Sequence, residues 1–357
     1  MAKENQRVLT AFFTERFYEN VLSPSSLENE LLCVFFLSFQ REIYAMRQRE
    51  DSYRFLTKNF LSNSLCNGLI RAKSDLTSYC SIITKAITEN IQLLEANSPF
   101  EFDIEKSNDQ FSSRKADFAN FESIGRLSPS RRKSSHDLAE RSNNFCANFS
   151  KKDLINLSLS YKDKDEDMND FIDAQIFLLG DKEEEFTNFK FLLKIAELEN
   201  GGPIFQDYRT SFNICKDILT NIIDTLINNL DIIPYYIKCL CKIISILAEK
   251  KFGDLKSYEK NIFIGNFFFG VILKPFFINL DFNIYLNSPG ISNNTKHNLE
   301  VIYSILNKLV SGKLYASGDK NELNYTPFNG FMVNLMPKVF KFYKGLLDVK
   351  LPDIVNK

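Results

Sequence analysis

The residues that could hold a metal ion or act as nucleophiles are few and scattered. Seven cysteines occur, at positions 33, 66, 80, 146, 215, 239 and 241. None of them forms a CxxC pair, and the two histidines, His136 and His297, are far apart in sequence. Zinc sites and disulfide frameworks need closely spaced or paired ligands, so we expect reduced thiols, no metal site and no cofactor. Without a Gly-rich phosphate loop, most hydrolase and nucleotide-binding functions are disfavoured as well.

A basic, Ser-rich tract could accept phosphate. In RLSPSRRKSSHD (126–137), two arginines lie three residues before Ser134 and Ser135, the spacing that basophilic kinases favour. Ser128 precedes a proline and resembles a proline-directed site. Phosphorylation would reverse the local basic charge, which would make the tract a switch. The alternative is an unmodified, solvated linker.

The overall composition is that of a soluble globular protein. The chain has 357 residues, of which 44% are hydrophobic and 25% charged, and its formal net charge is -1. A balanced charge gives no global attraction to nucleic acid, so we expect no nucleic-acid partner. The start, MAKENQRVLTAFF, lacks the long apolar run and cleavage site of a secretory signal, which predicts a cytoplasmic protein.

The most apolar stretch is IFIGNFFFGVILKPFF (262–277). A membrane-spanning helix needs about 20 mostly apolar residues. The uninterrupted apolar run here is short, and it is bounded by Asn266, Lys274 and Pro275. We therefore expect a helix enclosed by other helices of a soluble domain, and no membrane span.

Apolar residues recur at helical spacing through most of the chain. The stripe is clearest in 212–230, and 295–311 repeats it before Gly312, which is placed to stop the helix. Pro234 announces another helix, and 27–43 and 76–94 have the same pattern. Strand-like alternation is scarce, so the predicted fold class is all-α.

The middle of the chain differs in composition. Residues 107–170 are rich in Ser, Asn and blocks of charge and show little periodicity, which is typical of a loop or disordered insertion. We predict one helical domain formed by 1–106 and 171–357, packed together across this insertion.

Several segments, in this order along the chain, resemble the Ras-GTPase-activating (RasGAP) domain, and specifically the GAP-related domain of the IQGAP scaffold proteins. The resembling segments are LENELLCVFFLSFQREI (27–43), FEFDIEK (100–106), IIPYYIKCLCKIISILAEKKF (232–252), IGNFFFGVILKPF (264–276), TKHNLEVIYSILNKL (295–309), the Asn329-Gly330-Phe331 triplet and FKFYKGLLDV (340–349). The resemblance implies an elongated helical RasGAP-like domain. It covers about 27–106 and 171–349 and leaves the Ser-rich insertion unmatched.

The resemblance also locates the two arginines of an active GAP. The first, the arginine finger, offsets charge on the transferred phosphoryl group and contributes roughly 10³–10⁵ in rate. The second braces the finger loop. The resemblance places the finger at Thr57 in YRFLTKNFLSNSL (53–65) and the bracing arginine at Val271. Neither side chain is cationic, so we predict no GTPase-activating activity, unless a shifted loop presents Arg54 or Lys58 instead.

Nearby positions of the family pattern diverge too: Lys274 stands for Asn, Phe276 for Ala and Ser304 for Lys. The resemblance implies a partner-binding surface formed by Thr57, Lys58, Asn59, Lys274, Asn307 and Asn329. Its partner would be a small GTPase of the Rho or Ras type, and the protein would act as an effector or cytoskeletal scaffold. Alternatively, the chain is a purely structural subunit of a cytoskeletal assembly that keeps only the fold. In some of these positions the residue could equally brace the fold: Asn307 and Asn329 as polar braces, and Lys274 as the cap of a helix C-terminus.

Overall fold

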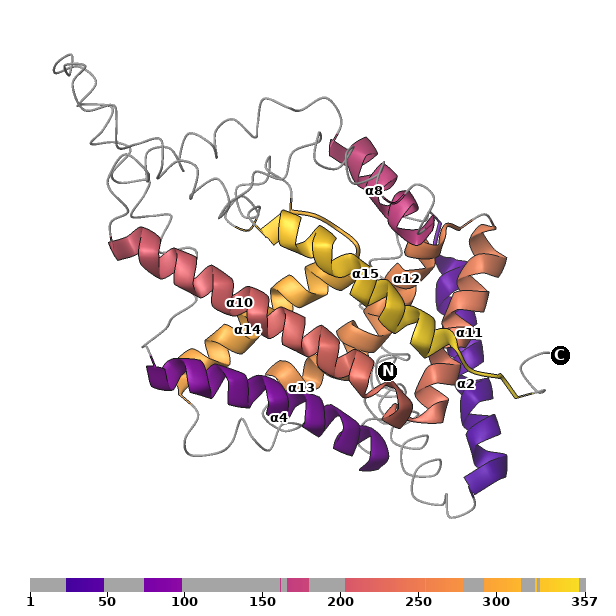
Figure 1. Cartoon of the computed structure of the whole chain (residues 1–357). Coiled ribbons are helices and arrows are strands. Elements are labelled where there is room, and N and C mark those ends of the chain that lie inside the picture. Colours follow the sequence, from indigo (N-terminus) through magenta and orange to yellow (C-terminus); the bar gives the residue numbers. More distant parts are fainter. Residues whose placement is uncertain are drawn as a thin grey trace, which may run out of the picture. The chain divides into compact units, whose positions relative to one another are not determined.

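The computed structural model describes residues 24–47, 74–97, 161, 166–179, 203–253, 255–278, 292–315, 325 and 328–352. All regular elements within these ranges are helices, which confirms the predicted all-α class (Figure 1). The chain divides into two compact units. The first comprises Met1–Asn97, Ile218–Lys313 and Met336–Lys357, and the second comprises Ser98–Asp217 and Leu314–Leu335.

The first unit contains most of the described helices: α2 (Pro24–Ala45), α4 (Ser74–Asn97), α11 (Tyr235–Phe252), α12 (Ser257–Phe267), α13 (Lys274–Ile278) and α14 (Asn293–Val310), with a 3-10 turn, η4 (Leu230–Ile232), and a π-helical turn, η5 (Phe268–Leu273). The second unit contains α8 (Glu166–Leu179). Two long helices, α10 (Pro203–Asn228) and α15 (Phe328–Leu347), each contribute one part to each unit.

Local sequence signals explain where several helices begin and end. The Ser292 hydroxyl accepts a hydrogen bond from the Thr295 N–H at 3.1 Å, which satisfies one free donor in the first turn of α14. Gly312 follows that helix with φ of 64°, a conformation that favours glycine, so the predicted stop is confirmed. Pro234 lies at the N-cap of α11, and Gly253, with φ of 70°, follows its end.

Helices from the two ends of the chain pack together in the first unit. Helix α2 contacts α11, and α4 contacts both α13 and α14. The C-terminal ends of α2 and α11 lie side by side, because Lys251 Nζ is 5.8 Å from the centre of the Tyr44 ring. The N-terminal segment therefore packs on the C-terminal half, as one domain built across an insertion requires. The domain boundaries themselves stay a prediction, and α8 already begins at Glu166, inside the range assigned to the insertion.

Helices α12 and α13 are joined through η5 into one continuous helix. The Lys274 N–H donates to the Phe269 carbonyl five residues back, as a π-helical turn requires. Pro275 follows at once, and in an α-helix its ring would clash with the carbonyl four residues earlier. The wider turn gives the ring room, so the helix continues to Ile278. Lys274 therefore lies inside a continuous helix, and its alternative role as the cap of a helix C-terminus is wrong.

Other helices of the first unit surround this continuous helix. Phe268 contacts the rings of Tyr79 on α4 and Phe342 on α15, with centroids 6.5 and 5.1 Å away. Phe267 contacts Phe39 on α2 at 5.6 Å. By length and composition, 257–278 could cross a membrane, but 67% of its most apolar window is buried within the protein. The enclosing helices thus supply the apolar surroundings that the sequence leads us to expect; the absence of a membrane span stays a prediction.

Because the helices approach closely at Gly265, alanine substitution should affect stability very differently at two glycines of the same continuous helix. A Cβ at Gly265 would lie 2.6 Å from the Tyr343 hydroxyl and 2.9 Å from the Val310 carbonyl oxygen, whereas a Cβ at Gly270 would meet nothing within 4 Å. Gly265→Ala should therefore lower the free energy of unfolding by about 1–3 kcal/mol.

The matched control is Gly270→Ala, which should change the free energy of unfolding by less than about 1 kcal/mol. Chemical denaturation of the two variants measures both values. Equal effects of the two substitutions would contradict the packing described here.

Candidate functional site

Val271 lies within η5 and is 7% exposed. Its neighbours in the turn, Phe269 and Ile272, are fully buried. A branched hydrocarbon side chain in this position offers neither charge nor a hydrogen-bond donor. The position at which the resemblance places the bracing arginine is therefore filled by apolar packing.

Two buried tyrosine hydroxyls bond to backbone carbonyls, one in this turn and one at the end of α14. The Tyr303 hydroxyl on α14 donates to the Phe269 carbonyl at 3.2 Å, and the Tyr343 hydroxyl on α15 donates to the Val310 carbonyl at 2.9 Å. Burial raises the pKa of both phenols, and for Tyr343 the neighbouring Cys241 raises it further. These hydroxyls therefore stay protonated at neutral pH and act as fixed donors, not as acid–base groups.

The exposed polar residues of this region lie on α13 and α14, which contact each other. Lys274 is exposed at the first residue of α13. Ser304 and Asn307 are exposed on α14, one turn apart. Lys274 and Asn307 are therefore both accessible to a partner, as the predicted binding surface requires. Their role in binding stays a prediction.

Asn329 belongs to the second unit and has a different environment. Its side chain is 3% exposed and makes two hydrogen bonds to one residue. The Tyr315 N–H donates to Asn329 Oδ1 at 2.8 Å, and Asn329 Nδ2 donates to the Tyr315 carbonyl at 3.0 Å. This paired geometry ties the loop that follows α14 to the start of α15. Of the two roles considered, the structure favours a polar brace for Asn329.

The remaining predicted residues lie outside the described ranges. They are the finger-loop positions Arg54, Thr57, Lys58 and Asn59 and the serines Ser128, Ser134 and Ser135. Among the described residues, no group of His, Cys, Asp or Glu could hold a metal ion. The described cysteines, at 33, 80, 215, 239 and 241, are free thiols, and all except Cys33 are buried.

The sequence reasoning missed two features. One is the π-helical turn itself, whose only signal is a proline placed after an apolar run that has no polar face. The other is a row of lysines on α15, spaced three residues apart in PKVFKFYKG (337–345). That spacing places all three on one side of a helix and could have been recognised.

The family model for the GTPase-activator protein for Ras-like GTPase matches residues 38–311, which is more than half of the chain. The chain belongs to the RasGAP family. It is also 23% identical over 141 residues to the mouse (Mus musculus) protein named Ras GTPase-activating-like protein IQGAP2. That match covers 39% of this chain and only 9% of the relative. The predicted resemblance to the RasGAP domain, and to the IQGAP type within it, is confirmed.

Two asparagines of this RasGAP domain allow a test of whether each residue supports the fold or is available to contact a partner. Asn329→Ala removes both partners of the Tyr315 backbone groups and should lower the free energy of unfolding by about 2–4 kcal/mol, since each unpaired buried group costs about 1–3 kcal/mol. Asn307→Ala, on an exposed helix position, should change it by less than about 0.5 kcal/mol. Thermal or urea unfolding of both variants decides the matter. A stable Asn329→Ala protein would show that the bridge does not support the fold.

The buried phenols predict a loss of stability at alkaline pH. A raised pKa in the folded state means that the unfolded chain releases the proton first, near pH 10, and that ionisation then favours unfolding. The stabilisation is complete below about pH 10 and is lost progressively above it. Tyr303→Phe should reduce this alkaline loss, measured as the free energy of unfolding against pH relative to the wild type. An unchanged pH dependence would contradict the assignment.

Proposed function

We propose that this chain binds a small GTPase of the Rho or Ras type without accelerating GTP hydrolysis. Membership of the RasGAP family supports a small GTPase as the partner. The similarity to a protein whose name describes it as Ras GTPase-activating-like also supports a partner of this kind. The chain spans about 9% of that relative's length, so the relative's wider roles are not carried over.

The observation that carries the proposal is the burial of Val271. GAP catalysis depends on an arginine that offsets charge developing on the phosphoryl group. The brace for that arginine has to hold it within a fraction of an ångström of its productive position. At 7% exposure and without a polar atom, Val271 cannot hydrogen-bond to a finger loop. Thr57, at the finger position by the resemblance, likewise has no charge to contribute.

Binding a GTPase requires fewer precisely placed groups than accelerating GTP hydrolysis does. A GTPase can be held by exposed polar and cationic side chains on a rigid helical face, and Lys274 and Asn307 are such side chains. Both lie on helices anchored in the aromatic core of the first unit, because α13 contacts α14 and the Phe277 ring lies 5.6 Å from that of Tyr303. In this account the protein acts as an effector or scaffold in the cytoplasm, in association with the cytoskeleton.

Binding to GTP-loaded and GDP-loaded GTPases of the Rho and Ras types tests the proposal. We expect at least one GTPase to bind in its GTP form more tightly than in its GDP form. Lys274→Glu should weaken that binding about tenfold or more, because a charge reversal inside an interface costs well over 1 kcal/mol.

Lys250→Glu is the matched control, since Lys250 is also an exposed helical lysine and lies outside the predicted surface. It should leave the affinity within about twofold. If no GTPase in the panel binds in a nucleotide-dependent way, the proposal fails, and the structural-subunit alternative gains support.

A further inference from the structure

The C-terminal half of α15 presents a row of lysines to solvent. Lys338, Lys341 and Lys344 follow one another at intervals of three residues, which places them within about a third of a turn around the helix. Lys341 and Lys344 are exposed, and Lys338 is partly exposed. The opposite side of the same helix, with Phe342 and Tyr343, is buried. The lysines therefore form the outer face of α15 in the first unit.

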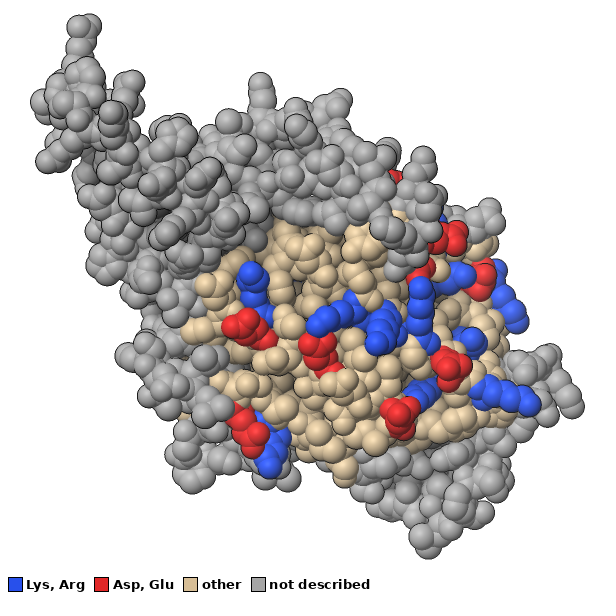
Figure 2. Space-filling model, viewed as in Figure 1, with Lys and Arg blue, Asp and Glu red and all other residues tan. Residues whose placement is uncertain are grey.

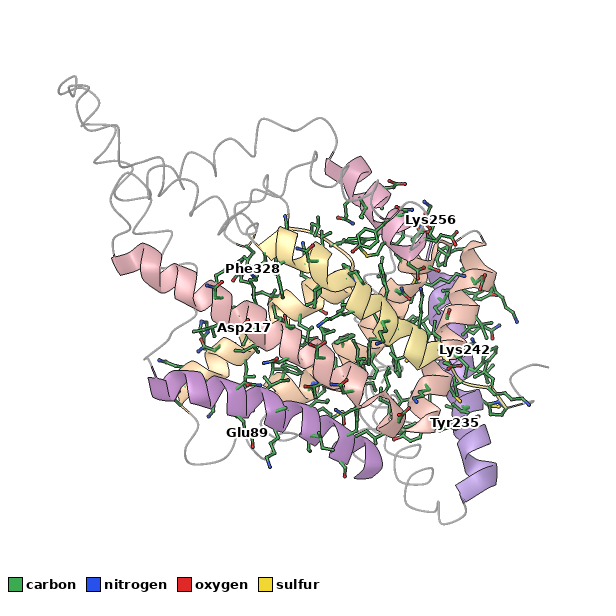
Figure 3. The ribbon with its side chains drawn as sticks, viewed as in Figure 1. Glu89, Asp217, Tyr235, Lys242, Lys256 and Phe328 are labelled. Atoms are coloured by element: carbon green, nitrogen blue, oxygen red, sulfur yellow. The ribbon has the colours of Figure 1, made fainter. Side chains whose placement is uncertain are left out.

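Helix α11 extends this basic surface. Lys242 Nζ donates to the Leu347 carbonyl at 3.2 Å, which places it against the C-terminal end of α15 (Figure 3). Lys238 lies one turn earlier on α11, and Lys350 is exposed just after α15. We call these six residues, Lys238, Lys242, Lys338, Lys341, Lys344 and Lys350, the lysine face. Figure 2 shows basic side chains gathered in the region of α15 and α11, with acidic side chains beside them.

The acidic residues on the same stretches do not neutralise the lysine face. Over residues 218–252 and 336–352 they are Asp224, Asp231, Glu249 and Asp348, so the six lysines of the face outnumber these four by two. Asp224 is paired with Lys338, with 2.7 Å between Nζ and Oδ1. A local excess of this size contrasts with the formal net charge of -1 for the whole chain. The excess is therefore a local feature of this face.

Two exposed apolar side chains border the lysine face. Ile232 is 51% exposed at the end of η4, and Tyr235 is 48% exposed at the first residue of α11. The Tyr235 hydroxyl donates to the Lys350 carbonyl at 2.7 Å, which fixes the ring beside the end of the lysine face (Figure 3). An aromatic ring with a polar tip and an exposed aliphatic side chain suit the boundary between lipid headgroups and acyl chains.

We propose that the lysine face, with Ile232 and Tyr235, is a docking surface for a membrane rich in anionic lipid. Clustered lysines near an anionic bilayer are each worth about 1 kcal/mol, or roughly fivefold in binding. The apolar pair adds a contribution that salt does not screen and that a purely electrostatic contact lacks. This peripheral contact differs from a membrane span, and it uses none of the residues assigned to GTPase binding.

Co-sedimentation of the full chain with vesicles tests the proposal. The chain should bind vesicles of equal parts phosphatidylcholine and phosphatidylserine and should not bind vesicles of phosphatidylcholine alone. Lys341→Gln with Lys344→Gln should weaken binding by about tenfold or more. The matched control, Lys85→Gln with Lys250→Gln, changes the net charge equally at two exposed lysines outside the face and should stay within about twofold of the wild type.

A third variant, Ile232→Ser, tests the apolar part. It should weaken binding to the mixed vesicles by a similar factor at low and at high salt, because the lost contact is not electrostatic. Failure to bind the mixed vesicles, or equal losses in the two double-lysine variants, would overturn the proposal. Binding to polyglutamate without binding to vesicles would overturn it in favour of an acidic protein partner. Unfolding midpoints equal to the wild type confirm that each variant is folded.

Discussion

The close approach of three helices at Gly265 is the constraint on which the first unit depends. Because Gly265 has no Cβ, the Tyr343 hydroxyl and the Val310 carbonyl oxygen can approach its backbone closely. Helices α12, α14 and α15 therefore converge at this residue. That convergence brings the rings of Phe268, Phe269 and Phe342 within 6 Å of one another. Tight packing of this kind leaves little tolerance for added volume.

The same packing limits the chemistry that the helix can carry. A guanidinium at position 271, where Val271 is 7% exposed, would have to be desolvated, at a cost that only a full set of hydrogen-bond partners could offset. The buried phenols near it already donate to backbone carbonyls and stay protonated. An apolar core fills the turn to which the resemblance assigns the bracing arginine. Among the described residues near this turn, Lys274 and Asn307 are exposed, and these are the side chains that the proposal assigns to GTPase binding.

The sequence predicted the helices well where polar and apolar residues alternate with helical period. The stripe in 212–230 and the Gly312 stop after α14 are examples, because amphipathic spacing and left-handed glycines each have a local cause. It failed at Lys274 and Pro275, where a proline normally signals an end. The π-helical turn accommodates the proline, and the contacts that α14 and α15 make with this turn appear in no local pattern. The apolar run predicted that Val271 is buried. The paired hydrogen bonds of Asn329 could not be predicted, because they join it to the backbone of Tyr315 in another segment.

Single-turnover hydrolysis of GTP on a small GTPase that binds the chain tests the central claim most directly. The chain is added at saturating concentration, and the rate is compared with the intrinsic rate of the GTPase alone. The account predicts the same rate within about twofold, since an active arginine would raise it roughly 10³–10⁵-fold. An acceleration of that order, abolished by Arg54→Ala or Lys58→Ala, would contradict the account and show that another cation replaces the missing arginines.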